Sequence, residues 1–118
     1  MESAFICDRE TFSNIYELEK RRSERDWSSV YLSQIKISSE ERKNEEIEMA
    51  GDQLIDILSS KMRAGDTVCH WDDNKYLMII YDIAENDIPG VMTRISDEFF
   101  QNGNKFDYEL KIEYQLLK

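Results

Sequence analysis

The chain is short of the residues that build metal centres and disulfide frameworks. Its 118 residues include two cysteines and one histidine. Cys7 and Cys69 are far apart and match no spacing typical of a metal site, so we expect no metal and no cofactor. Both thiols are expected to be reduced and mostly buried, and a disulfide between them stays open. His70 has no ligand-type partner nearby and is expected on a strand, exposed or half-buried.

Long hydrophobic runs are also missing. The longest apolar run, Tyr76–Tyr81, is far too short to cross a bilayer. The first residues, Met1–Phe5, lack the basic region and the long apolar region of a signal peptide. The sequence therefore predicts a cytoplasmic protein with no membrane partner.

Positive charge is scarce. The chain carries 25 acidic and 15 basic residues, a net charge of −10. Since nucleic-acid affinity depends on neutralising phosphates with Lys and Arg, we expect no direct nucleic-acid contact. The one basic cluster, Lys20 to Arg25, is interleaved with glutamates, which is typical of a solvated helix face.

The remaining composition, 41% hydrophobic and 34% charged, is that of one globular domain over residues 1–118. Helical periodicity predicts helices near residues 8–25 and 45–63 and a third that opens at Asn86 or Asp87. Alternation predicts strands near residues 30–37, 67–71, 75–83 and 108–116. In the first strand, Tyr31 and Ile35 share one face, while Leu32 and Lys36 share the other.

After the first helix the predicted order is β-α-β-β-α-β. This order is typical of an α+β, ferredoxin-like sandwich with a four-stranded antiparallel sheet and helices on one face. The last strand alternates strictly between apolar and polar residues. We therefore expect the second sheet face to be wet, or partly covered by the extra N-terminal helix.

Two short segments carry a family resemblance. Arg63-Ala64-Gly65-Asp66 ends the second predicted helix, and five residues later comes the turn Asp72-Asp73-Asn74-Lys75-Tyr76. Their spacing is similar to that of the diguanylate cyclase (GGDEF) family, which joins two GTP molecules on a Gly-Gly-Asp/Glu-Glu-Phe hairpin. Arg94-Ile95 also resembles an Arg-Ile pair of that family.

The resemblance implies the fold and argues against the reaction. The hairpin glycines are replaced by Asp72 and Asp73, where bare backbone would meet the nucleotide. The two acids are replaced by Asn74 and Lys75, and the aromatic residue survives as Tyr76. Gln34 and Lys36 stand where the family places Mg²⁺-binding aspartates, and Mg²⁺ requires oxygen ligands. We therefore expect no enzyme activity.

The N-terminal part carries a narrower resemblance. Its residues are Phe5-Ile6-Cys7-Asp8, Phe12, Ile15-Tyr16, Leu18-Glu19, Arg21-Arg22 and Arg25. This pattern resembles the degenerate GGDEF-like module at the C-terminus of bacterial transcriptional activator domain (BTAD) regulators. It implies a domain excised from a longer regulator, acting as a non-catalytic regulatory or protein-interaction module. Its partners would be the other domains of that regulator, with a homodimer possible and DNA bound elsewhere.

An alternative function rests on Arg63 and Asp66. In the GGDEF family an Arg-x-x-Asp site binds cyclic di-GMP, so Arg63, Asp66 and Arg94 would form a nucleotide receptor here. In the simpler interpretation Arg63 caps a helix C-terminus and Asp66 hydrogen-bonds the Gly65 turn. Gly51-Asp52 resembles another nucleotide-contacting pair, but it lies about one helical turn too close to Arg63 and is not carried over.

A cation site is a further alternative. Asp72, Asp73 and Asp82 could form an acidic cluster, although turn preference alone explains Asp and Asn at a hairpin tip.

Overall fold

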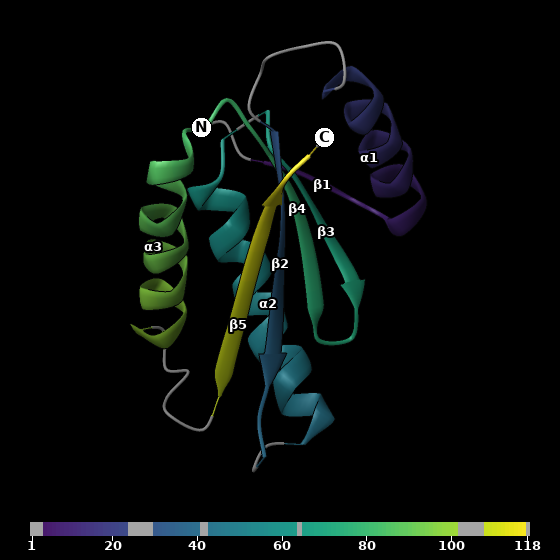
Figure 1. Ribbon diagram of the computed structural model, residues 1–118. Helices are drawn as coiled ribbons and strands as arrows, with labels where there is room; N and C mark the ends of the chain where they lie inside the picture. The colour runs from purple at the N-terminus through teal and green to yellow at the C-terminus, as the bar shows by residue number, and fades with distance from the viewer. Residues whose placement is uncertain (1–3, 24–29, 41–42, 64, 102–107, 118) are drawn as a thin grey trace.

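The computed structural model describes residues 4–23, 30–40, 43–63, 65–101 and 108–117. Within these residues, five strands and three helices follow one another, with a short 3₁₀ turn before the last helix (Figure 1). In order they are β1 (Phe5–Cys7), α1 (Arg9–Ser23), β2 (Val30–Ser38), α2 (Asn44–Lys61), β3 (Thr67–Asp72), β4 (Lys75–Tyr81), the 3₁₀ turn (Glu85–Asp87), α3 (Ile88–Gln101) and β5 (Glu109–Leu116). The predicted end of the first helix, near Arg25, lies outside the described residues.

The predicted ferredoxin-like core is confirmed. Strands β2 to β5 lie in the sheet order β3-β4-β2-β5, and each neighbouring pair is antiparallel. The sequence of elements from β2 to β5 is the predicted β-α-β-β-α-β. The chain is therefore an α+β protein with a ferredoxin-like core.

The expectation of a purely antiparallel, four-stranded sheet was wrong at one edge. The short strand β1 pairs with β3 in parallel, with Phe5 opposite Thr67 and Cys7 opposite Cys69. This makes the sheet five-stranded and mixed. A strand of three residues is too short to show the alternation by which strands are recognised from sequence, so β1 could not be predicted.

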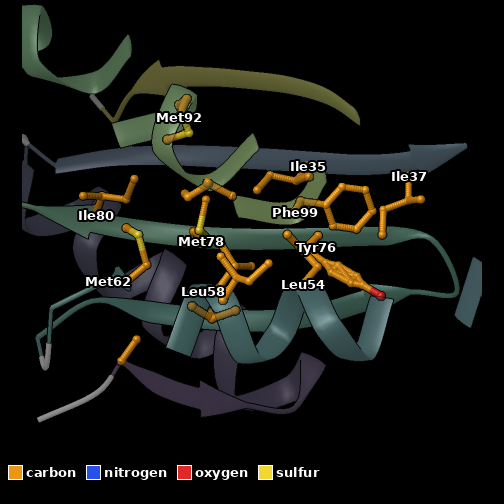
Figure 2. Close-up of a cluster of buried hydrophobic side chains, with 14 of the residues drawn as sticks. Ile35, Ile37, Leu54, Leu58, Met62, Tyr76, Met78, Ile80, Met92 and Phe99 are labelled. Atoms are coloured by element: carbon orange, nitrogen blue, oxygen red, sulfur yellow. The ribbon is translucent and has the colours of Figure 1, made fainter. Parts of the chain in front are cut away.

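One sheet face is covered by α2 and α3. Side chains from the sheet and both helices form a closed core (Figure 2), among them Ile35, Leu54, Met78 and Phe99, each 0% exposed. Tyr31 and Ile35, which were predicted to share one face of the strand, both lie in this core, whereas Lys36 of the other predicted face is exposed. The predicted alternation of that strand is confirmed.

The other sheet face is only partly covered, as predicted. Helix α1 packs against β3 (Figure 1), and Phe12 joins Cys69 and Ile79 in a second, smaller core. The backbone N–H of Thr11 donates to the Asp8 carboxylate at 2.8 Å, so Asp8 caps the N-terminus of this helix. None of the described helices is long and apolar enough to span a membrane.

Buried polar groups attach α1 to the sheet. Glu19 is 6% exposed and accepts a hydrogen bond from Arg22 at 3.1 Å. It also accepts one from the Tyr81 hydroxyl, and burial together with the Glu19 carboxylate raises the pKa of Tyr81 to about 12. A buried carboxylate requires such partners, so these contacts explain why the apolar stripe of α1 ends in a glutamate.

Candidate functional site

The predicted site residues lie at the two ends of the β3–β4 hairpin. Arg63 and Asp66 lie at the end where β3 begins and β4 ends, here called the hairpin base. Asp72 to Tyr76 lie at the turn between the strands, here called the hairpin tip. The strands thus separate the two predicted motifs.

At the hairpin base, the Asp66 carboxylate is fully engaged within the protein. Asp66 is 2% exposed. One carboxylate oxygen accepts the backbone N–H of Arg63 at 3.0 Å, and the other accepts that of Tyr81 at 3.1 Å. A carboxylate that satisfies two backbone donors closes the turn after α2 and fixes it to the end of β4. The structural role predicted for Asp66 is therefore observed.

Arg63 has a different role from the predicted helix cap. Its guanidinium donates to the carbonyl oxygens of Tyr81 and Asp82, at the C-terminal end of β4, and its Nε lies 3.7 Å from Asp66. It therefore caps a strand end, because α2 has already ended at Lys61. Asp82 adopts a φ of 51°, a left-handed conformation that aspartate tolerates better than most residues.

A cavity at the hairpin base brings the predicted ligand residues together. It has a volume of about 480 Å³, and its lining includes Arg63, Asp66 and Arg94. Asp82 and Asp87 also line it. The basic charges around the cavity are thus opposed by carboxylates, and Asp66 already has internal partners.

The hairpin tip is a tight turn, as predicted. Asp72 and Lys75 are Cα partners and close a turn formed by Asp73 and Asn74. The backbone N–H of Asp73 donates to the Asp72 carboxylate at 2.9 Å, and the Asn74 carbonyl accepts the N–H of Ile37 at 2.9 Å. Turn chemistry and these backbone contacts account for the polar residues at the tip.

Tyr76 points from the hairpin tip into the core. It is 0% exposed, and its hydroxyl has no hydrogen-bond partner among the described residues. Figure 2 shows it beside Leu54 of α2, with the hydroxyl oxygen in red. Burial, reinforced by the charges of Asp52 and Glu48, raises the pKa of Tyr76 to about 12. The ring of His70 stacks on that of Tyr76 at 4.5 Å, and His70 is exposed on its strand as predicted.

The Tyr76 hydroxyl explains a residue that sequence analysis set aside. A Cβ atom on Gly51 would lie 1.8 Å from this hydroxyl oxygen, so only glycine fits at that point of α2. The available signal was a glycine inside an otherwise good helical pattern, which often marks a close packing contact. Sequence spacing alone did not connect it to Tyr76.

The two positions that the resemblance links to Mg²⁺ binding are Gln34 and Lys36. Lys36 on β2 is the Cα partner of Lys75 on β4, so the strand pairing places two lysines opposite each other. Within the described ranges no group of three His, Cys, Asp or Glu side chains could hold a metal ion. The proposed cluster of Asp72, Asp73 and Asp82 is not assembled, because Asp82 follows the opposite end of β4.

The two cysteines meet although they are far apart in sequence. Cys7 and Cys69 are Cα partners across β1 and β3, and both are free thiols. Burial raises the pKa of both thiols, that of Cys69 to about 11. A buried thiol with a raised pKa is a poor nucleophile, so the pair has the properties of core residues.

Comparison with solved structures agrees with this architecture. The chain superposes on a DGC protein from Thermotoga maritima with a TM-score of 0.79 and 17% identity. The match covers 94% of the present chain and 81% of that protein chain. The fold is GGDEF-like. Diguanylate cyclase SiaD from Pseudomonas aeruginosa, solved in complex with its activator SiaC, matches with a TM-score of 0.68 and 16% identity. The present chain matches 94% of its own length but spans only 46% of SiaD. No protein-family model and no curated protein sequence matches the chain.

Proposed function

We propose that this GGDEF-like domain is a non-catalytic regulatory or protein-interaction module of a bacterial transcription regulator. In this proposal another domain of the same protein binds DNA. The resemblance of the N-terminal residues to BTAD regulators supports this context, and the net charge of −10 disfavours DNA binding by the domain itself.

The observation that carries the non-catalytic assignment is the pairing of Lys36 with Lys75. Cyclisation of GTP by the resembling family depends on Mg²⁺, which is bound through carboxylate and phosphate oxygens. Two neighbouring ammonium groups repel the metal. At the same hairpin, Asp72 and Asp73 are exposed and add negative charge where a triphosphate would approach.

A turnover assay tests the first part of the proposal. The purified chain is incubated with GTP and Mg²⁺, with an active diguanylate cyclase as positive control, and the product is measured by chromatography. We expect no cyclic di-GMP from the wild type or from Asn74→Asp, because one restored carboxylate leaves both lysines in place. Product formed by the wild type would contradict the proposal.

The regulator context is tested on the full-length protein. Sequencing the adjoining coding region is expected to reveal a DNA-binding domain, and a membrane sensor there would contradict the regulator assignment. Promoter binding by the full-length protein is then compared with that of a form lacking residues 1–118. We expect the deletion to change the affinity or the response to partners, while DNA binding itself is retained.

A second candidate function is a nucleotide receptor, favoured by the cavity that gathers Arg63, Asp66 and Arg94. The lining balances three bases, Lys61, Arg63 and Arg94, with three acids, Asp66, Asp82 and Asp87. With no net positive charge and an Asp66 carboxylate that is already hydrogen-bonded, the cavity offers little attraction to an anionic ligand. Calorimetric titration with cyclic di-GMP at low salt is therefore expected to show no binding tighter than about millimolar, roughly −4 kcal/mol. A micromolar signal that is lost in Arg63→Ala and Arg94→Ala would establish the receptor function instead.

A further inference from the structure

Three lysines form a single row across the sheet. Lys36 of β2 is the Cα partner of Lys75 on β4 and also of Lys111 on β5. Because neighbouring strands lie about 4.8 Å apart, the outer two Cα atoms are roughly 10 Å from each other. Lys36 and Lys111 are exposed and Lys75 is half-buried. This set is called the lysine row below.

The lysine row is unfavourable for the isolated sheet. Like charges directly opposite one another on neighbouring strands are destabilising, and bases are the minority charge in this chain. Lysine on an edge strand protects against aggregation, which accounts for Lys111 because β5 is an edge. It does not account for Lys36 and Lys75, since β2 and β4 are interior strands.

Among the described residues, carboxylates lie beside the two ends of the lysine row. Asp72 is the Cα partner of Lys75. Glu113 lies 3.6 Å from the ammonium group of Lys111. Lys36, in the middle, has lysines as both of its Cα partners. It forms no ion pair with a carboxylate among the described residues, so its ammonium group is the one most open to a partner's carboxylate.

The lysine row adjoins the open part of the sheet. Since side chains two residues apart on a strand share one face, Lys36 lies on the same face as Gln34 and Leu32. A hollow of about 370 Å³ on this face is lined by Leu32, Gln34, Leu77, Glu113, Tyr114 and Gln115. Helix α1 packs over the β3 side of this face, and α2 and α3 pack on the opposite face.

We infer that the lysine row and this hollow dock a short acidic segment of a partner protein. Carboxylates of the segment meet the lysine row, and one of its apolar side chains occupies the hollow over Leu32 and Leu77. The positive charges of the lysine row complement the carboxylates of the segment, and Leu32 and Leu77 form an apolar floor in the adjoining hollow. The inference rests on the proposed protein-interaction role and names the chemistry of the partner.

Nucleic acid fits this surface less well. A domain with net charge −10 repels a dense polyanion, whereas a short acidic segment carries few charges. Leu32, Gln34 and Leu77 give the hollow an aliphatic and amide floor, while single-stranded nucleic acid is bound on aromatic platforms. The ring of Tyr114 is already packed edge-on against Tyr31.

Peptide binding to the whole chain tests the inference. The probe is a dye-labelled peptide of alternating glutamate and leucine, measured by fluorescence anisotropy at low salt. We expect saturable binding that weakens with added salt and falls roughly tenfold in the combined variant Lys36→Gln, Lys75→Gln, Lys111→Gln. The matched control, Lys20→Gln, Lys43→Gln, Lys61→Gln, removes the same charge elsewhere and should change the affinity less than about twofold.

Three results would overturn the inference: no binding by the wild type, equal losses in the two combined variants, or tighter binding of a single-stranded oligonucleotide that depends on the same lysines. Circular dichroism of both variants checks that they remain folded. GTP turnover is measured on the same preparations. If the chain neither binds the peptide nor turns over GTP, only the docking surface is refuted. If it turns over GTP, the non-catalytic assignment is refuted.

Discussion

The two ends of the β3–β4 hairpin differ in whether their buried polar groups have hydrogen-bond partners. At the hairpin base, both oxygens of the buried Asp66 carboxylate accept backbone N–H groups. At the hairpin tip, charged side chains are exposed, while the Tyr76 hydroxyl is buried with no hydrogen-bond partner among the described residues. Both ends resemble family motifs, yet only the base shows the complete hydrogen bonding expected of a structural element.

This difference separates residues that hold the fold together from residues that are exposed on its surface. The residues at the hairpin base hold α2, β3 and β4 together, so changing them should affect stability first. The residues at the hairpin tip affect stability little through their exposed charges, so their identity is free to follow another function. Four predictions test this contrast, from the largest expected effect to the smallest.

Asp66→Ala should cost the most. It leaves the backbone N–H groups of Arg63 and Tyr81 without their acceptor in a buried site, and we expect the free energy of unfolding to fall by about 3 kcal/mol. Urea denaturation measures the loss. Asp72→Ala at the hairpin tip is the matched control and should stay within about 0.5 kcal/mol of the wild type. Equal effects at both ends would remove the contrast.

Gly51→Ala should lower the free energy of unfolding by about 2 kcal/mol, because its methyl group overlaps the Tyr76 hydroxyl. Tyr76→Phe alone should raise it by about 1 kcal/mol, since an unpartnered buried hydroxyl is removed. In the double variant Gly51→Ala, Tyr76→Phe, the alanine should lower the free energy of unfolding by less than it does in the presence of Tyr76. Gly90→Ala in α3 meets no atom within 4 Å and should be neutral or stabilising. If the effects of Gly51→Ala and Tyr76→Phe on the free energy of unfolding simply add, the contact between residue 51 and the Tyr76 hydroxyl is refuted.

Stability should decline in alkaline solution. The pKa values of Tyr76 and Tyr81 are both raised to about 12, so the unfolded chain releases these protons first and stability falls as pH rises from about 10 towards 12. Below pH 10 this contribution is fully present. Either phenylalanine variant should flatten the decline, measured by urea denaturation at several pH values.

Neutral pH distinguishes the two tyrosines. Tyr81→Phe removes a hydrogen bond to Glu19 and should be destabilising, whereas Tyr76→Phe should not. An unchanged alkaline decline in both variants would show that other groups cause it.

Lys36→Gln should have the smallest effect. Relief of repulsion from Lys75 and Lys111 is expected to raise the free energy of unfolding by about 0.5 kcal/mol. Because salt screens exposed charges, the gain should diminish as salt is added. Lys43→Gln, at the start of α2, is the control and should show no such gain. A loss of stability in Lys36→Gln would mean that the lysine row is not strained.

Much of the candidate site could be predicted from the sequence, because turns and helix starts depend on a few neighbouring residues. Turn-forming residues around Asp73 predicted the hairpin tip, and helical periodicity predicted α1 from residue 8. Arg63 and Asp66, which were grouped from sequence, contact each other in the structure. The actual hydrogen-bond partner of the Arg63 guanidinium was not accessible, because the carbonyl groups of Tyr81 and Asp82 lie on a strand whose end is brought there by sheet pairing.

The sequence by itself determined the order of elements, the alternating faces of each long strand and the tight turn at the hairpin tip. These features depend on periodicities and turn preferences that span a few neighbouring residues. The tertiary structure alone decided that β1 joins the sheet, that Cys7 meets Cys69, that Gly51 faces Tyr76 and that three lysines share one row. The physical reason is register. Which residues face each other across strands depends on how distant segments pair. An alternating pattern fixes which face of a strand is buried, but it does not say which strand will lie beside it.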